Sequence, residues 1–267
     1  MTANKLTITS GKGGVGKTTA TANLAVALSD FGQSVVCIDA DIGLRNLDVV
    51  MGLENRIVYD LVDVVEGRCR IRQAMIKDKI FENLYLIPAA QTRDKNAVSP
   101  TDMINLVADL ESEFDWVLID SPAGIERGFK NAIAPADQVI VVTNPDVSAV
   151  RDADRIIGII ESEQKGPAKL IINRLNSLMV SRGEMLNAED ILDLLAVPLI
   201  GIVPEDERVI ISTNIGKPVV LDQKSLAGTV FRNIARRLMG EEIDLIDLEY
   251  KGDFLQRLTN AFKPGGK

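Results

Sequence analysis

The chain has 267 residues, of which 46% are hydrophobic, so it is long enough for one large α/β domain with a sizeable core. Its net charge of −8 at pH 7 argues against nucleic-acid binding by the chain as a whole. Histidine is absent, which excludes histidine-based triads, metal ligands and proton relays. Any chemistry must therefore use carboxylates, lysines and a metal ion.

The first elements in chain order indicate a phosphate-binding loop. An apolar run over residues 5–9 precedes a glycine-rich segment, and a helical pattern over 19–31 follows it. This order of strand, loop, lysine, threonine and helix is typical of a P-loop, in which backbone N–H groups surround the β-phosphate. Lys17 is expected at the β and γ oxygens and Thr18 at Mg²⁺. The predicted nucleotide-binding residues here are Gly11, Lys12, Gly13, Gly14, Val15, Gly16, Lys17, Thr18 and Thr19.

Lys12 is a second lysine at the front of this loop. Since Lys17 already serves the local phosphates, Lys12 is either a surface lysine or directed at another group. The residues alone leave both interpretations open.

Apolar runs typical of buried strands recur further along the chain, with helical patterns between most of them. These runs cover residues 35–39, 84–88, 116–120, 138–143, 169–173 and 199–203. Ser99-Pro100 is a helix start signal, and we expect another helix to begin near Ser148 and run through Ile160. Because the runs are nearly continuous, we predict a single-domain α/β P-loop NTPase fold. Its mostly parallel sheet should have about seven or eight strands, with helices on both faces.

Acidic residues follow two of the predicted strands. Asp39 and Asp41 end the second strand, and in an extended chain this spacing would point both carboxylates to one side. Asp120 follows four apolar residues, a pattern typical of an acid that holds Mg²⁺ through water, and Gly124 is expected to offer an N–H to a γ-phosphate. Such acids are often only turn residues or helix caps. Two of them together with a P-loop favour a magnesium site.

The two cysteines and the termini carry further signals. Cys37 and Cys69 form no CxxC motif, so no disulfide, zinc or iron–sulfur site is predicted, and Cys37 is expected in the core. No signal segment and no run of ~20 apolar residues is present, so we expect a cytoplasmic protein. Without a transit segment a bacterial origin is favoured, although a trimmed organellar chain remains an alternative.

The composition changes in the C-terminal part of the chain, first to acidic and then to basic residues. We assign residues 1–240 to the ATPase domain, 241–249 to an acidic linker and 250–267 to a basic amphipathic segment. Its apolar residues at helical spacing are Phe254, Leu255, Leu258 and Phe262. This pattern suits the interface of an anionic membrane, and a helix docked on the protein body is the alternative.

The loop with two lysines resembles that of the MinD/ParA family of P-loop ATPases. Longer blocks resemble the MinD branch, namely residues 41–48, 120–126, 148–155, 181–186 and 204–206. The resemblance implies an Mg²⁺-dependent ATPase that converts ATP to ADP and phosphate, dimerises with ATP and helps to position the division septum. It also implies attachment to the cytoplasmic face of the inner membrane, MinC as inhibitor partner and MinE as stimulating partner.

The same resemblance implies roles for single residues. Lys12 would reach a partner subunit's phosphates and act with Lys17 and Asp41 in catalysis, while Asp39 and Asp120 would lie at the magnesium ion. The residues implied at the nucleotide base are Asn173, Arg174, Pro204 and Glu205, and those implied at a partner-binding surface are Arg151, Asp152 and Asp154. Without the resemblance, the four residues at the base would be interpreted as ordinary turn residues, and the three at the partner surface as a solvated helix face.

Other functions stay open on sequence alone. A ParA-like DNA-segregation ATPase would use a basic patch, although nearby acids favour a solvated face. Its best candidates are Arg68, Arg70, Arg72, Lys77 and Lys79. A flagellar-number regulator ATPase would share the anchor, and a P-loop kinase would need an arginine-rich lid that is not visible. We expect no specific nucleic-acid partner.

Overall fold

The computed structural model describes residues 2–94 and 96–248. An eight-stranded sheet forms its centre, with the strand order β3-β4-β2-β5-β1-β6-β7-β8, and every neighbouring pair is parallel except β3 and β4. The strands are β1 (Asn4–Thr9), β2 (Val35–Asp39), β3 (Ile76–Lys77), β4 (Leu84–Ile87), β5 (Trp116–Asp120), β6 (Gln138–Thr143), β7 (Lys169–Leu175) and β8 (Leu199–Pro204). The predicted α/β fold is confirmed.

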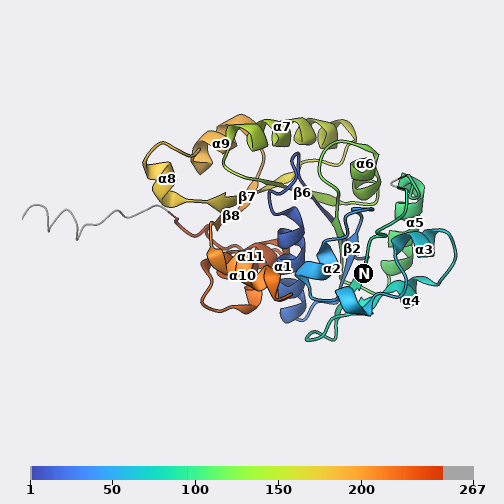
Figure 1. The fold of residues 1–267 in the computed structure, drawn as a ribbon. Coiled ribbons are helices and arrows are strands. Elements are labelled where there is room, and N and C mark those ends of the chain that lie inside the picture. The colour runs from blue at the N-terminus through green and yellow to red at the C-terminus, as the bar shows by residue number, and fades with distance from the viewer. Residues whose placement is uncertain (1, 95, 249–267) are drawn as a thin grey trace, which may run out of the picture.

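Helices cover both faces of this sheet (Figure 1). The α-helices are α1 (Lys17–Asp30), α2 (Leu47–Val50), α3 (Leu61–Val65), α4 (Ile71–Ala74), α5 (Pro100–Leu110), α6 (Arg127–Ile133), α7 (Val147–Ser162), α8 (Ser177–Ser181), α9 (Ala188–Leu195), α10 (Glu207–Asn214) and α11 (Leu226–Leu238). Two short 3₁₀ helices are η1 (Glu54–Arg56) and η2 (Val219–Leu221). Within the described ranges, no helix is both long enough and apolar enough to cross a bilayer.

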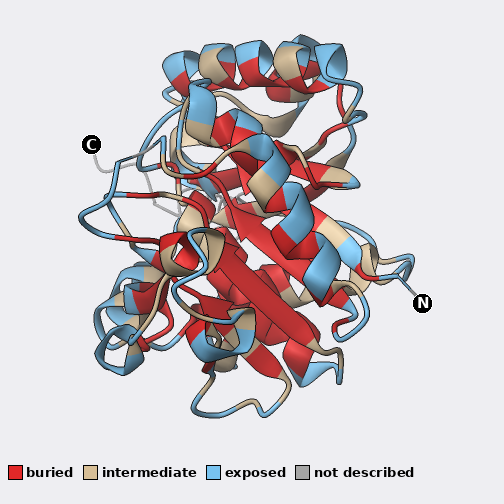
Figure 2. Ribbon diagram, turned by 90° about the vertical axis from the view of Figure 1, so that its right-hand side faces the viewer, coloured by how far each residue is buried: buried red, intermediate tan, exposed pale blue. Residues whose placement is uncertain are grey.

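The core lies between the sheet and its helices, and Figure 2 shows the strands as buried at the centre of the molecule. Alternate strand residues point to opposite faces, as the pleat requires. In β2, Val35 and Cys37 join a cluster with α1 and α11, whereas Val36 and Ile38 join another with α3 and α5. A third cluster packs α6, α7 and α9 on the same face as the second. The expected core position of Cys37 is confirmed, and burial raises the pKa of its thiol.

Two details differ from the sequence-based expectations. The side chain of Asp146, not Ser148, caps α7 by accepting a hydrogen bond from the Ala149 N–H, so the helix begins at Val147. Strand β3 has only two residues, too short for any periodic signal, and it pairs antiparallel at the edge of the sheet. The predicted start at Ser99-Pro100 is confirmed, with Ser99 and Asp102 forming a reciprocal capping box.

One contact between distant loops involves backbone alone. Gly52 follows α2 and Gly216 follows α10, and both have positive φ angles, of 67° and 62°. A Cβ atom built on Gly216 would lie 2.6 Å from the Cα atom of Gly52. Only glycine allows two chains to approach this closely, so the ends of α2 and α10 are in direct contact.

Candidate nucleotide-binding site

A cavity of about 680 Å³ opens at the carboxyl ends of β1, β2 and β5. Its walls come from the loop between β1 and α1, the loops after β2 and β5, and helices α2, α5 and α6. This is the edge at which ligands bind in open parallel sheets. The predicted loop and strand-end residues therefore lie at this end of the fold.

The loop between Thr9 and Lys17 forms one wall of the cavity. Gly14 and Gly16 have φ angles of 77° and 96°, which are readily adopted only by glycine. A Cβ atom on Gly16 would lie 2.2 Å from the Asn173 side-chain nitrogen, which donates to the Val15 carbonyl over 2.7 Å. Asn173 thus packs behind the loop, and a glycine is needed at position 16 for both conformation and space.

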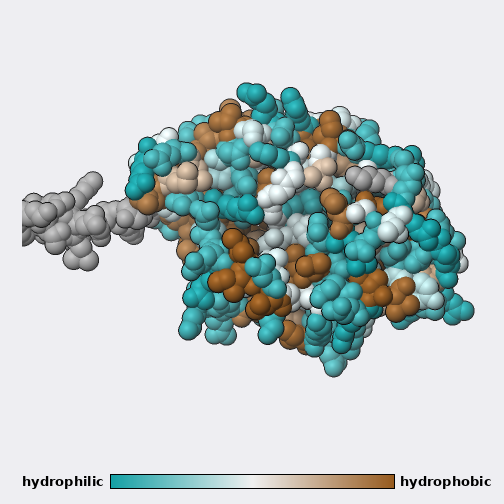
Figure 3. All heavy atoms as spheres, in the orientation of Figure 1, coloured by the Kyte–Doolittle hydropathy of each residue, from teal (hydrophilic) through white to brown (hydrophobic). Residues whose placement is uncertain are grey.

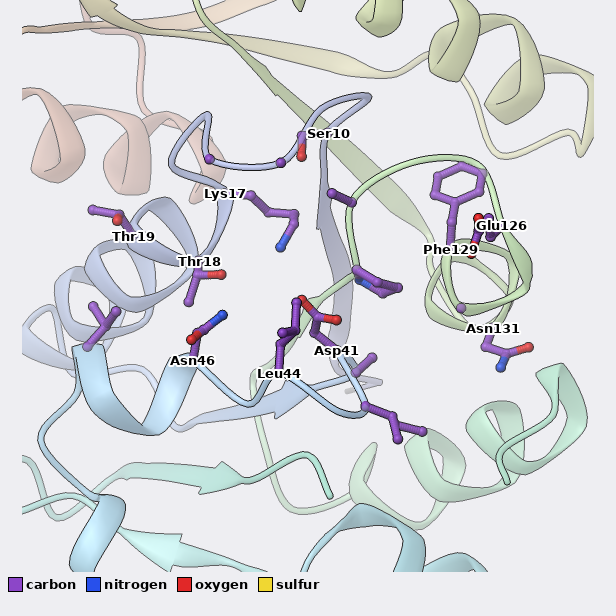
Figure 4. Close-up of a pocket in the computed structure, with 18 of the residues that line it drawn as sticks. Ser10, Lys17, Thr18, Thr19, Asp41, Leu44, Asn46, Glu126, Phe129 and Asn131 are labelled. Atoms are coloured by element: carbon purple, nitrogen blue, oxygen red, sulfur yellow. The ribbon is translucent and has the colours of Figure 1, made fainter. Parts of the chain in front are cut away.

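Lys17 is buried, yet its ammonium group reaches the cavity (Figure 4). Nζ lies 3.2 Å from Oδ1 of Asp120, and the Thr21 hydroxyl donates to the same oxygen over 3.1 Å. Thr18 lines the cavity beside it. Of these contacts, sequence reasoning missed the one made by Thr21, although its position four residues after Lys17 puts it on the same helical face.

The two acids after β2 lie in different environments. The strand ends at Asp39, so the expected strand geometry does not extend to Asp41, and the two carboxylates do not act as a matched pair. Asp39 is buried and accepts hydrogen bonds from the N–H groups of Asp41, Asn46 and Leu47. Asp41 instead lines the cavity (Figure 4). Asp39 therefore fixes the loop that presents Asp41.

Asp39 and Asp120 are partners in the register between β2 and β5. Burial, followed by the negative charge of Asp120, raises the pKa of Asp39 to about 7. A divalent cation nearby would relieve this repulsion. Among the described residues no three acids, cysteines or histidines cluster as a metal site, so the donors that fit Mg²⁺ are the Thr18 hydroxyl, nearby carboxylates, water and substrate phosphates.

Lys12 lies outside the cavity wall that holds Lys17. Its side chain is 46% exposed, and Nζ donates to the Ser148 hydroxyl over 2.7 Å and lies 3.8 Å from Asp146. No sequence pattern indicates this contact, because Ser148 is 136 residues away. The two lysines of one loop therefore occupy distinct environments, and Lys12 contacts the start of α7.

Gly11 brings the same loop against α7. A Cβ atom on Gly11 would lie 2.3 Å from backbone atoms of Asp152, whereas a Cβ on Gly13 would meet nothing within 4 Å. We expect Gly11→Ala to lower the free energy of unfolding by about 1–3 kcal/mol through overpacking, and Gly13→Ala to change it little. Urea unfolding of both variants without nucleotide measures this. Equal free energies of unfolding for the two variants would show that α7 can move away from an added Cβ atom at no cost.

Several predicted residues lie near the cavity but make other contacts. The Gly124 N–H donates to the Ser10 carbonyl over 3.0 Å, so in this structure it is not offered to a phosphate as we expected. Asn173 is buried behind the loop, while Arg174, with a φ of 59°, lines the cavity. Pro204 and Glu205 lie at the end of β8, and Glu205 accepts from the Asn176 side chain. Of the four predicted base contacts, only Arg174 lies in the cavity wall as described.

The predicted partner surface and the rival basic patch also have defined positions. Arg151 and Asp154 are exposed on α7, and Asp152 is half-buried and paired with Arg155. In the basic patch, four of the five side chains have partners among residues 2–94 and 96–248. Arg68 pairs with Asp63 and Glu66, Arg72 with Glu113, Lys77 with Glu82, and Lys79 donates to the Gly52 carbonyl. These pairs weaken the DNA-binding alternative.

The strand, glycine-rich loop, buried lysine and strand-end aspartates at the carboxyl edge of this sheet define a P-loop nucleotide-binding protein. The sequence matches the CobQ/CobB/MinD/ParA nucleotide binding domain family over residues 6–219. The chain belongs to the MinD branch of this family of P-loop ATPases.

Similar proteins support this assignment. The chain is 55% identical over 259 residues to the septum site-determining protein MinD of Bacillus subtilis, covering 96% of this chain and 97% of that protein. The structure of the MinC:MinD cell division protein complex from Aquifex aeolicus matches with a TM-score of 0.86 and 49% identity, over 92% of this chain and 99% of that chain. MinD complexed with Mg-ADP from Pyrococcus horikoshii matches with a TM-score of 0.80 and 29% identity, over 90% and 100%. A ParA family ATPase from Chlorobium tepidum, at 22% identity, shares the fold.

Proposed function

We propose that this protein hydrolyses ATP with Mg²⁺, dimerises when ATP is bound, and attaches reversibly to the cytoplasmic face of the inner membrane to help position the division septum. The observation that carries the proposal is that the two lysines of the loop differ in burial and in their contacts. Lys17 is buried at the cavity with Asp120, whereas Lys12 is half-exposed and contacts the Ser148 hydroxyl and the Asp146 carboxylate at the start of α7. A lysine held on the surface in this way is available to meet phosphates of a second copy.

Within one subunit, the site residues would act by position and charge. The backbone N–H groups of the loop and Lys17 would bind the β- and γ-phosphates. Thr18, Asp39 and Asp120 would hold Mg²⁺, directly or through water, and the ion would neutralise charge on the phosphates. Asp41, on the loop fixed by Asp39, would orient the attacking water. Asn173, Arg174, Pro204 and Glu205 would border the nucleotide base.

An apolar surface beside the cavity supports dimerisation. We call Val49, Ile210, Ile211 and Ile215 the mouth patch, and their exposed fractions are 48%, 65%, 56% and 62%. Figure 3 shows apolar residues gathered over α2 and α10, where this patch lies. Val49 and Thr213 also line the cavity, so the patch borders the nucleotide. Exposed apolar clusters of this kind commonly mark protein interfaces.

Partner proteins would bind near the same region. The MinD of Aquifex aeolicus is found in a complex with MinC, and we propose MinC as inhibitor partner here and MinE as the partner that stimulates hydrolysis. The surface of α7 with Arg151, Asp152 and Asp154 would contribute. Because Gly11 packs on the Asp152 backbone, a partner that binds α7 and shifts it would also shift the phosphate-binding loop.

Membrane attachment is assigned to residues 250–267, which lie outside the described residues. Burying Phe254, Leu255, Leu258 and Phe262 would yield roughly 6 to 10 kcal/mol at most, before the cost of ordering the segment. One copy is therefore a weak anchor. Two copies in one dimer would gain a factor of about 10² to 10⁴ in avidity, so attachment would follow dimerisation.

Co-sedimentation with vesicles of anionic lipid tests the proposal directly. We expect the protein to pellet with ATP and to remain in the supernatant with ADP or without nucleotide. A ParA-like DNA binder would instead be retained on DNA in a salt-dependent manner and show no lipid requirement. Nucleotide-independent pelleting, or none at all, contradicts the proposed cycle.

We expect Leu258→Glu to reduce vesicle pelleting with ATP at least tenfold, because it places a charge on the predicted apolar face. The control is Ile104→Glu, since Ile104 is 46% exposed on α5 and lies outside that face. It should pellet like the unmodified protein. Pelleting of the Leu258 variant at the control level would refute the role of this segment.

A further inference from the structure

The first part of the predicted linker is packed against the domain. The strap, as we call residues 241–248, follows α11 and crosses the open edge of the sheet at β8. Ile246 packs on the core cluster of one sheet face, and Leu248 packs on the cluster of the opposite face. The strap therefore passes from one face of the sheet to the other around its last strand.

The guanidinium group of Arg237 joins the strap to strand β8. Arg237, in the last turn of α11, donates to the Ile200 carbonyl of β8 over 2.8 Å. The same side chain donates to the strap carbonyls of Ile243, over 2.9 Å, and Asp244, over 2.6 Å. Charged donors make the stronger hydrogen bonds, and the planar fork of arginine suits acceptors on two chain segments at once.

The neighbouring arginine provides a natural contrast. Arg236 pairs with the carboxylate of Glu241 at the surface, where such pairs contribute little. Among the described residues, its side chain makes no hydrogen bond to β8 or to the strap beyond Glu241. The two arginines lie in the same helical turn and each carries a positive charge. Of the two, only Arg237 connects the strap to the sheet.

We propose that Arg237 is a positioning residue that fixes where the membrane segment leaves the domain. This inference rests on the proposed function, because it concerns the same membrane segment. With the strap docked, the described part of the chain ends at Leu248, which packs on the sheet face of α7 and α9, so the tether to the membrane segment would begin there. With the strap released, the tether would begin at the end of α11 and have about ten more flexible residues. A longer tether lowers the effective concentration of the second anchor in a dimer.

Two measurements on full-length Arg237→Gln, with Arg236→Gln as control, test this proposal. The first is cleavage by a protease that cuts before aspartate, at Asp244 and Asp247. We expect at least tenfold faster cleavage for the Arg237 variant and a rate within twofold of the unmodified protein for the control, since proteolysis follows the open population. The second is the apparent affinity of the ATP-bound protein for anionic vesicles. We expect this to fall about three- to tenfold for the Arg237 variant alone.

The outcomes separate the inference from the proposed function. Cleavage of the Arg237 variant at the control rate, or faster cleavage with unchanged vesicle affinity, would overturn the positioning role. If the unmodified protein fails to bind vesicles with ATP, the proposed membrane function is wrong, while the cleavage result still decides whether Arg237 holds the strap. Ile246→Ser provides a second variant, since it weakens the strap's packing without altering Arg237, and it should match Arg237→Gln in both measurements.

Discussion

Lys12→Ala is expected to leave ATP binding nearly intact but to abolish the ATP-dependent dimer. Lys17 and the loop backbone remain in place for the local phosphates, whereas the ammonium group available to a second subunit is removed. A charge contact at ~4 Å in a partly buried site is worth up to ~4 kcal/mol, which corresponds to a preference for ATP over ADP of up to about a thousandfold. Light scattering with ATP, together with nucleotide titration of the monomer, measures both quantities.

Ser148→Ala is the matched control for this experiment. It removes the hydroxyl that holds Lys12 in the single chain, 2.7 Å from Nζ, but keeps the ammonium group. We expect this variant to dimerise with ATP at least as well as the unmodified protein. A normal ATP dimer of the Lys12 variant would show that the lysine has no role across the interface.

Asp41→Ala is expected to have the opposite effect, trapping an ATP-bound dimer that turns over slowly. Asp41 lines the cavity, and removal of a group that positions a nucleophile typically lowers the rate by a factor of about 10² to 10⁴. Single-turnover hydrolysis and light scattering over time follow the two quantities. Hydrolysis at the unmodified rate would exclude Asp41 from this role.

The double variant links the two predictions. If the trapped dimer depends on a lysine that crosses the interface, Lys12→Ala should return Asp41→Ala to a monomer with ATP. A double variant that stays dimeric would mean that the dimer is held by the mouth patch, without the lysine. Non-additivity of this kind identifies residues that act through one interface.

Much of the fold followed from local patterns. The strands that hold the site are continuous apolar runs, and the loop between β1 and α1 has a spacing that only a phosphate-binding loop commonly uses. The predicted bounds of β2, β5 and β6 are confirmed, because buried parallel strands leave a strong signal in sequence. The location of the cavity followed from the topology.

The contacts that were missed are those between distant segments. The partner of Lys12 on α7, the amide of Asn173 behind Val15 and the carbonyls around Arg237 are set by packing, and no periodicity encodes them. The segment that we predicted as an acidic linker, residues 241–249, makes contacts of the same kind. Its acidic composition resembles a solvated segment, but two apolar side chains, Ile246 and Leu248, are enough to pack it on the domain.

The backbone contact between Gly52 and Gly216 has a consequence for how the domain responds to its ligand. Helix α2 lines the cavity through Val49 and Val50, while α10 carries most of the mouth patch. Two backbones in contact have no rotamers that could absorb a displacement, so a shift of α2 toward α10 would push α10 in the same direction. Binding of a ligand in the cavity would thus move α10 as a whole, and with it the mouth patch that a second subunit would contact. This coupling would depend on the backbone contact and would need no change in a side-chain rotamer.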